Sequence, residues 1–274
     1  MIKHFSFFAN WRKTDVDFLN NLSLDRKIEQ GYFGFKIEEG DTYERIMEHF
    51  SKKDSIFSKT KPKEFSCTFT TVSFSKSELE KSKYYELKST GESKGFPLPE
   101  NSFEEEIFKI ACSNCKSGIE QKASFHIKEV KWKKNQANFT LRDPDFMFFR
   151  KRFFQEILHP LGLESREVII HKTGKVSDDI VQLEIPFSKS KLIIDGSSYD
   201  NGVFCEKCGV KQYSIQTLDF FPPFEKELNF YICKTQEEFI GGRRRIIISK
   251  EFCELLVKHK IIKFNSWSLT PMKI

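Results

Sequence analysis

The sequence lacks both a long apolar run and a secretory leader. No window approaches the roughly 18 consecutive apolar residues that a membrane helix needs. The first 15 residues, MIKHFSFFANWRKTD, hold neither an apolar core nor a small-residue cleavage site. We therefore expect a cytoplasmic protein that does not enter a membrane.

The sequence also lacks the common motifs of catalytic and nucleotide-binding sites. It contains no P-loop, no G-x-G-x-x-G fingerprint and no G-x-S-x-G nucleophile turn. His126, His159 and His171 do not have the spacing of a catalytic zinc site. The acidic groups at 104–106 and 143–145 are typical of helix starts, where the helix dipole favours carboxylates. We expect a non-enzymatic protein, with an active site built from scattered residues as a competing hypothesis.

Positively charged residues only slightly outnumber negatively charged ones. The chain carries 45 Lys and Arg against 39 Asp and Glu, which gives a net charge of +6. A balance this mild does not require nucleic acid as a partner. The longest basic clusters are not interleaved with aromatic residues in the way a single-strand-binding face is. Nucleic acid is therefore an alternative partner only, through Arg150, Lys151, Arg152, Arg243, Arg244 and Arg245.

The overall composition is that of an ordinary globular protein. Hydrophobic residues make up 39% of the 274 residues, and 30 residues are Phe, which we interpret as core-forming. Stretches rich in β-branched and aromatic residues alternate with short segments of helical pattern. We predict an α+β fold with mostly antiparallel sheet and several short helices.

A turn-rich segment at 91–102, GESKGFPLPENS, divides the chain. We predict an N-terminal α+β region of unknown role at 1–100 and an α+β domain at 101–274, with one continuous domain as the alternative. Within the first region the pattern favours a strand at YFGFKI, a helix over 41–51 and a strand at KEFSCTFTTVSFS.

Two helices are predicted in the middle of the chain. Acidic residues favour a helix over 102–111, which would end just before Cys112. A second helix is predicted over 143–158, with Asp143 as N-cap, Pro144 in the first turn and Phe side chains at helical spacing. It should stop before the proline at 160.

The last 32 residues have the clearest pattern. RRRIIIS at 243–249 predicts a strand, and KEFCELLVKHK at 250–260 predicts a helix with Ser249 as N-cap. The segment 261–272 then returns as a strand. This strand–helix–strand order is the most specific local prediction that the sequence makes.

The seven cysteines fall into two groups. An odd number in a cytoplasmic chain does not indicate a disulfide framework. Cys67, Cys233 and Cys253 lie in strand and helix patterns and are interpreted as core residues. The other four form two C-x-x-C pairs, CSNC at 112–115 and CEKC at 205–208.

Two cysteines separated by two residues can hold one side of a zinc ion in a tight turn. A glycine after the second cysteine, as in CEKCG, eases the return of the backbone. CSNCKSG fits less well, because its glycine comes three positions after the second cysteine. The 89 residues between the pairs are tolerable because loop-closure entropy grows only logarithmically with length. We predict one structural Zn²⁺ site in the C-terminal half, with Cys112, Cys115, Cys205 and Cys208 as ligands.

Two other interpretations of the cysteine pairs stay open. A redox C-x-x-C would follow a strand and begin a helix, where the dipole lowers the thiol pKa. The pairs could also be unrelated reduced thiols. If all four do bind one metal ion, the site is closed to water and substrate and is therefore structural rather than catalytic.

The second pair and the C-terminal pattern together resemble the bacterial double-CxxCG motif family. After CEKCG come LDFF at 218–221, a strand and helix start at 247–252, a Leu pair at 255–256 and a final strand at 269–271. The resemblance covers about the last 75 residues, together with the first C-x-x-C pair at 112–115, and each such pair with its turn is called a knuckle. The family's first knuckle is usually a full CxxCG near the N-terminus, whereas here 111 residues precede it. Members are associated with polymorphic toxin systems and resemble immunity proteins.

This resemblance implies a zinc-binding immunity-type protein that binds and neutralises a cognate protein toxin. It also implies that no chemistry is performed and that the function lies in a protein-binding surface. The competing hypothesis is a zinc-ribbon protein that binds nucleic acid through the basic clusters named above.

Overall fold

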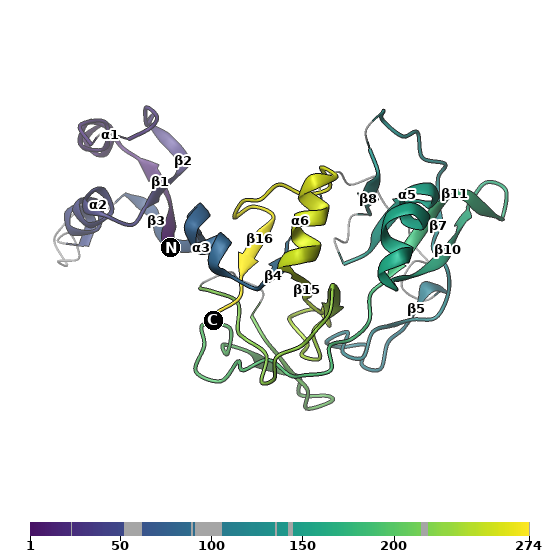
Figure 1. Ribbon diagram of the computed structural model, residues 1–274. Coiled ribbons are helices and arrows are strands. Elements are labelled where there is room, and N and C mark those ends of the chain that lie inside the picture. Colours follow the sequence, from purple (N-terminus) through teal and green to yellow (C-terminus); the bar gives the residue numbers. More distant parts are fainter. Residues whose placement is uncertain are drawn as a thin grey trace. The chain divides into compact units, whose positions relative to one another are not determined.

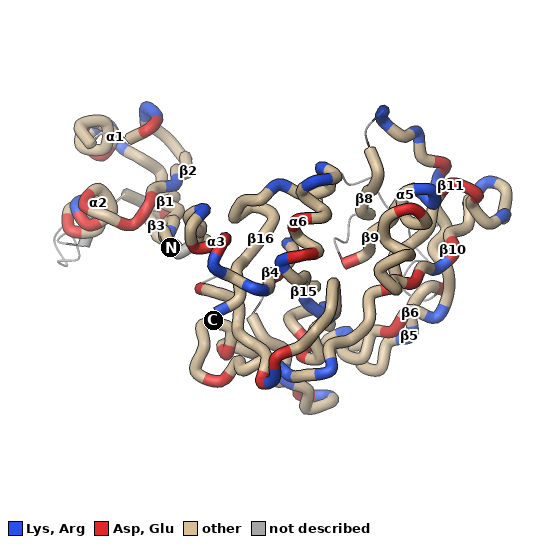
Figure 2. The backbone as a smooth tube through the Cα atoms, in the orientation of Figure 1, with Lys and Arg blue, Asp and Glu red and all other residues tan. Residues whose placement is uncertain are grey.

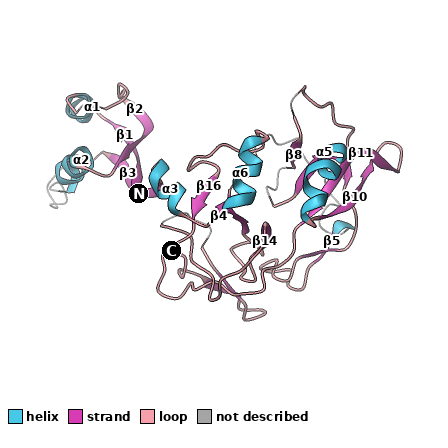
Figure 3. Ribbon diagram, in the orientation of Figure 1, coloured by secondary structure: helices cyan, strands magenta, loops and turns pink. Residues whose placement is uncertain are grey.

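The computed structural model describes residues 1–22, 24–51, 62–88, 90, 106–134, 136–141, 145–214 and 219–273. The chain divides into two units, Met1–Ser75 and Lys76–Ile274, and each is described by itself. The expected linker at 91–102 lies outside the described residues. Both units mix short helices with mostly antiparallel sheet, which confirms the predicted α+β class (Figure 3).

The first unit is a three-stranded antiparallel sheet with two helices. Its order is β2-β1-β3, with β1 at Ile2–Trp11, β2 at Gly31–Glu38 and β3 at Lys63–Ser73. Helices α1 (Lys13–Asn20) and α2 (Asp41–Ser51) follow β1 and β2. The predicted helix over 41–51 and both predicted strands of this region are confirmed.

One face of this sheet packs on the helices because aromatic residues alternate along β1. Phe7 and Trp11 are buried together with Phe35 of β2 and Phe50 of α2. The buried carboxylate of Asp15 accepts hydrogen bonds from the backbone and guanidinium of Arg12, which closes the start of α1. The Phe-rich composition therefore forms a core here, as expected.

The second unit contains a five-stranded sheet of order β7-β10-β11-β9-β8. Only β7 and β10 run parallel, and the central pair β10–β11 is the hairpin that turns at 171–174. Helix α5 packs on β11 (Figure 1). The strands are β7 (His126–Ile127), β8 (Asn138–Thr140), β9 (Met147–Arg150), β10 (Glu164–Ile170) and β11 (Lys175–Glu184).

The predicted helix over 143–158 is wrong in its first half. Met147–Arg150 forms β9, and helical turns begin only at α5 (Lys151–Phe153). They continue through Phe154–Leu158 and His159–Leu161, so the predicted stop before the proline at 160 is also wrong. Phe148 and Phe149 are both fully buried, on opposite faces of the sheet. An unbroken apolar run fits a strand covered on both faces as well as it fits a helix. Asp143 and Pro144, the predicted start, lie outside the described residues.

A four-stranded sheet of order β14-β15-β4-β16 forms the other part of this unit. Helix α6 (Lys250–Lys258) packs against β4 and β15 (Figure 1). Ser249 caps it as predicted, because its hydroxyl accepts a hydrogen bond from the backbone N–H of Phe252 at 3.2 Å. The short helix α3 (Lys76–Lys81) precedes these strands, which are β4 (Tyr84–Leu87), β14 (Ile232–Lys234), β15 (Ile246–Ser249) and β16 (Leu269–Pro271).

The predicted final strand over 261–272 is correct only at its end. Residues 261–268 form turns, and β16 pairs with β4 over three residues. Two-residue strands β5 (Phe108–Lys109) with β6 (Glu120–Gln121), and β12 (Val203–Phe204) with β13 (Lys211–Gln212), make two small hairpins. Each hairpin encloses one of the C-x-x-C pairs.

Candidate metal centre

The first cysteine pair lies in the β5–β6 hairpin rather than after a helix. Of the predicted helix over 102–111, residues 102–105 lie outside the described part of the chain, residues 106–107 are helical as predicted, and Phe108–Lys109 is a strand. Phe108 is buried against Phe125 and Phe146, so tertiary packing holds this segment extended. The expectation that a helix delivers Cys112 is therefore wrong.

The turn at the first pair is tight. The backbone N–H of Cys112 donates to the carbonyl of Ser117 at 3.1 Å. Lys116, directly after the second cysteine, has a φ of 60°, in the left-handed region that a side chain disfavours. The chain thus turns back at Lys116 without the glycine that the motif usually supplies.

The second pair forms the same turn in the β12–β13 hairpin. The backbone N–H of Gly209 donates to the carbonyl of Cys205 at 2.8 Å, and that of Cys205 donates to Val210 at 3.0 Å. Gly209 has a φ of 72°, which glycine adopts without steric cost. The two pairs are therefore two knuckles of the same backbone shape.

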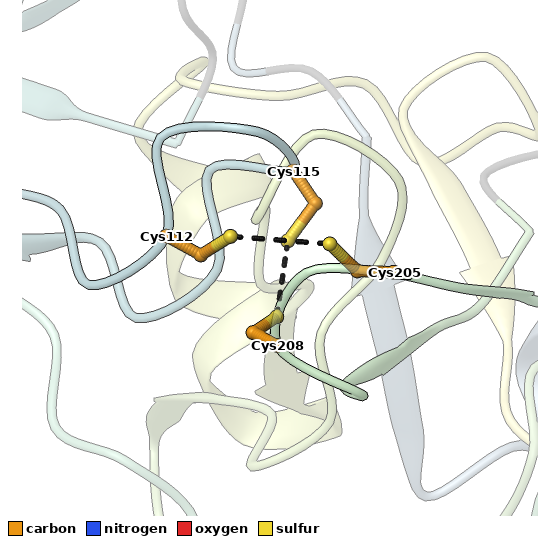
Figure 4. Close-up of side chains that lie close together, drawn as sticks. All are labelled: Cys112, Cys115, Cys205 and Cys208. Carbon is orange, nitrogen blue, oxygen red and sulfur yellow. Dashed lines mark hydrogen bonds between the residues drawn. The ribbon is translucent and has the colours of Figure 1, made fainter.

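The two knuckles face each other, and their four sulfur atoms converge (Figure 4). The sulfurs of Cys112 and Cys205 are 3.9 Å apart, and those of Cys115 and Cys208 are 3.6 Å apart. All four lie within 4.8 Å of one another, and none is in a disulfide. A tetrahedral ion with metal–sulfur bonds of about 2.3 Å requires sulfur–sulfur edges of about 3.8 Å. The four cysteines could therefore hold one metal ion.

The four cysteines differ in burial and in the direction of their pKa shifts. Cys112 and Cys205 are buried, whereas Cys208 is exposed. The side-chain amide of Asn114, in the first knuckle, donates to the sulfur of Cys205 and lowers its pKa to about 6, helped by the backbone N–H groups of Cys208 and Lys207. Burial raises the pKa of Cys115 to about 12. Without a metal, the Cys205 thiol therefore loses its proton far more readily than the Cys115 thiol. A bound cation would stabilise the deprotonated form of all four cysteines.

A turn at 238–242 fastens the two knuckles to each other. Glu238 accepts a hydrogen bond from the backbone N–H of Gly118 at 2.9 Å, and Gly242 lies so close to Lys116 that a Cβ there would overlap the Lys116 carbonyl. The buried side chain of Gln212 donates to the carbonyl of Cys115 at 2.8 Å and accepts from the N–H of Gly241. Hydrogen bonds from Glu238 and Gln212 thus hold the first knuckle in place.

Sequence reasoning did not find this supporting turn. Gln212, Glu238 and Gly242 belong to no motif, and 29 residues lie between the first and the last. The adjacent glycines at 241–242 are the one sequence signal that indicates a turn here. Their role follows from the approach of chain segments that a single sequence does not reveal.

The other cysteines and the histidines lie apart from this cluster. Cys233 and Cys253 are buried as predicted, and burial raises the pKa of each to about 12. Cys67 is half-buried against the core of the first unit. Within the described part of the chain, the only group of three or more Cys, His, Asp or Glu side chains that could hold a metal is the four-cysteine cluster.

The basic clusters are largely engaged in contacts within the protein. Arg150 lies over the ring of Trp132, and Arg152 pairs with Glu156 at 2.8 Å. Further along, Arg244 pairs with Glu238 at 2.9 Å, and Arg245 pairs with the buried carboxylate of Glu86 at 3.2 Å. Figure 2 shows acidic residues interspersed with the basic ones along the chain.

No family model, curated protein or solved structure matches this chain. The resemblance to the double-CxxCG family, which depends on a short motif, stays a prediction. Among the described helices, none has the length and apolar character needed to span a bilayer.

Proposed function

We propose that Cys112, Cys115, Cys205 and Cys208 bind one structural Zn²⁺. The supporting observation is the convergence of four thiols from two pairs with 89 residues between them, to separations of 3.9 Å for Cys112–Cys205 and 3.6 Å for Cys115–Cys208. Four thiolates fill a tetrahedral zinc completely. The ion would therefore cross-link two distant segments and leave no position for water or substrate.

The metal can be identified on the purified protein. We expect one zinc per chain by elemental analysis, and cobalt substitution should give the intense visible bands of a tetrahedral thiolate site. The same ligand set also suits iron. A red protein that contains iron and little zinc would contradict the proposed ion and leave the four-cysteine site in place.

We further propose that the protein is non-enzymatic and of immunity type, and binds and neutralises a cognate protein toxin. Two arguments support this role. A closed four-thiolate site offers no reaction centre, and the motif pattern resembles a family of immunity-like proteins. The zinc would then stabilise a binding surface and take no part in chemistry.

The test is co-expression with a candidate toxin encoded by a neighbouring gene. We expect cells that produce both proteins to survive and the two proteins to co-purify in a defined ratio. The Cys205→Ser variant should protect less well because the surface is no longer held in place. Cell death in the presence of the folded, zinc-loaded protein would contradict the immunity role.

Nucleic-acid binding, the alternative, receives less support. Arg152, Arg244 and Arg245 are held in ion pairs with carboxylates of the same chain, which reduces their attraction for phosphate. Binding through phosphate contacts falls steeply as salt rises. A steep salt dependence of DNA or RNA binding would favour this alternative over the immunity role.

A further inference from the structure

Each knuckle directs backbone N–H groups at its own two sulfur atoms in the same pattern. The first cysteine of a knuckle accepts from the residues two and three positions later, and the second cysteine accepts from the residue two positions later. The donors are Asn114 and Cys115 for Cys112, Ser117 for Cys115, Lys207 and Cys208 for Cys205, and Val210 for Cys208. The two halves of the centre are therefore equivalent in these backbone hydrogen bonds.

One side-chain hydrogen bond breaks this equivalence. The amide of Asn114, in the first knuckle, reaches across to the second knuckle and donates to the sulfur of Cys205 at 3.5 Å. The equivalent position of the second knuckle holds Lys207, whose ammonium donates instead to the hydroxyl of Ser113 at 3.4 Å. Cys205 therefore has a donor from the opposite knuckle in addition to those of its own knuckle.

A closed four-thiolate centre depends on such donors because its charge is not balanced. Four thiolates carry two more negative charges than a divalent ion neutralises. Hydrogen bonds from outside the ligand set spread this excess charge and fix the orientation of the ligands. A thiolate has no proton to donate, so only the NH2 end of the Asn114 amide can face it. Cys205 is only 7% exposed, so water cannot fully replace the amide if the amide is lost.

We propose that Asn114 is a positioning residue of the metal centre, which holds Cys205 as a thiolate ligand through a hydrogen bond between the two knuckles. This inference rests on the proposed four-cysteine metal site and names a residue outside the ligand set on which that site depends. A hydrogen bond to an ionised acceptor is stronger than one to a neutral thiol. The contact therefore adds to the affinity for the metal as well as to the attachment of one knuckle to the other.

The first measurement is zinc affinity, by competition between the full-length chain and a chromophoric chelator. Asn114→Leu removes the donor at similar size and should weaken zinc binding about tenfold, a usual scale for the loss of an outer hydrogen-bond partner of a metal ligand. Asn114→Asp keeps the shape and replaces the donor with a carboxylate that repels the thiolate, so zinc binding should weaken about 100-fold. Both variants keep all four cysteines.

The second measurement is the absorption spectrum of the cobalt-loaded chain, which a purely structural role of Asn114 would not change. Loss of the hydrogen bond leaves the Cys205 sulfur richer in electrons. In Asn114→Leu the sulfur-to-cobalt charge-transfer band should therefore move to longer wavelength. The matched control is Lys207→Leu at the equivalent position of the second knuckle, where the side chain donates to Ser113. This control should keep the wild-type band and the wild-type zinc affinity.

The possible results separate this inference from the proposed metal site. Wild-type zinc affinity or an unmoved cobalt band in Asn114→Leu would overturn the role of Asn114. Equal changes in Lys207→Leu would also overturn it, because any side chain between the two cysteines of a knuckle would then have the same effect. In these cases the metal site stands, since the wild-type chain still binds its ion. If the wild-type chain binds neither zinc nor cobalt, the metal site itself fails, and the role of Asn114 fails with it.

Discussion

The two knuckles reach the same backbone shape from different sequences. In the second, Gly209 takes the left-handed conformation after the last cysteine, with a φ of 72°. In the first, Lys116 takes it with a φ of 60° and bears the steric cost of its side chain. Hydrogen bonds to the 238–242 turn hold the first knuckle in this conformation. A glycine after the pair is therefore a helpful feature of a knuckle rather than a necessary one.

Gly118, the glycine nearest to the first pair, allows a close contact between the two strands of the hairpin. Gly118 has a φ of 68°, donates its N–H to Glu238 and lies so near Ala111 that a Cβ would come within 2.6 Å of the Ala111 side chain. It brings the strand after the knuckle into contact with the one before it. The two knuckles thus have their glycines at different positions in their hairpins, Gly209 directly after the second cysteine and Gly118 three positions after it.

The largest expected effect comes from removing one ligand from each knuckle. Cys112→Ser and Cys208→Ser should both lose the metal and cost several kcal/mol of stability, because binding of a structural metal is coupled to folding. If the thiols were unrelated, the exposed Cys208→Ser should stay within about 0.5 kcal/mol of wild type. Zinc content and urea unfolding measure both quantities. Cys67→Ser, outside the cluster, is the control and should keep its zinc.

The second-largest effect is expected from substitutions in the 238–242 turn, which contacts the first knuckle. Gly242→Ala should cost about 3 kcal/mol, since its Cβ would overlap the Lys116 carbonyl and its φ of 71° disfavours a side chain. Gly241→Ala has a similar φ and open space around it, so it should cost only about 1 kcal/mol. Thermal unfolding and zinc affinity should rank the two variants in this order. Equal costs would show that the close approach to Lys116 does not support the knuckle.

How much of this site could be foreseen depends on the kind of signal. The spacing of Cys112, Cys115, Cys205 and Cys208 predicted the cluster because tetrahedral thiolate chemistry is local to each pair. The cap at Ser249 was also local. Gln212 and Glu238 could not be foreseen, because their hydrogen bonds join segments that are distant in sequence.

The errors in the fold have the same origin. Phe149 and Phe153 have helical spacing, yet Phe149 ends up in β9, stacked on Phe153 of α5 at 5.8 Å. The acidic start of the predicted helix over 102–111 gave no hint that Phe108 pairs with Gln121 in a hairpin. In both places burial of Phe outweighed local propensity, which is a tertiary effect.

A smaller effect is expected from a side chain at the second knuckle's turn. Gly209→Ala should cost about 1 kcal/mol, because no atom lies within 4 Å of the added Cβ and only the backbone strain remains. Zinc stoichiometry should stay at one, as the first knuckle already tolerates a side chain at this point. Loss of zinc in Gly209→Ala would show that the two knuckles are not equivalent.

The smallest effect is expected when the non-glycine residue at the turn of the first knuckle is replaced by glycine. Lys116→Gly should raise stability by up to about 1 kcal/mol, since it relieves the left-handed strain, partly offset by the greater freedom of glycine in the unfolded chain. Lys207→Gly is the matched control, because Lys207 also lies in a knuckle and has no positive φ. It should lower stability by about 0.5–1 kcal/mol. If both glycine variants were destabilised equally in urea, Lys116 would not be strained. The left-handed backbone conformation would then cost nothing at Lys116, although it favours glycine at position 209 of the second knuckle.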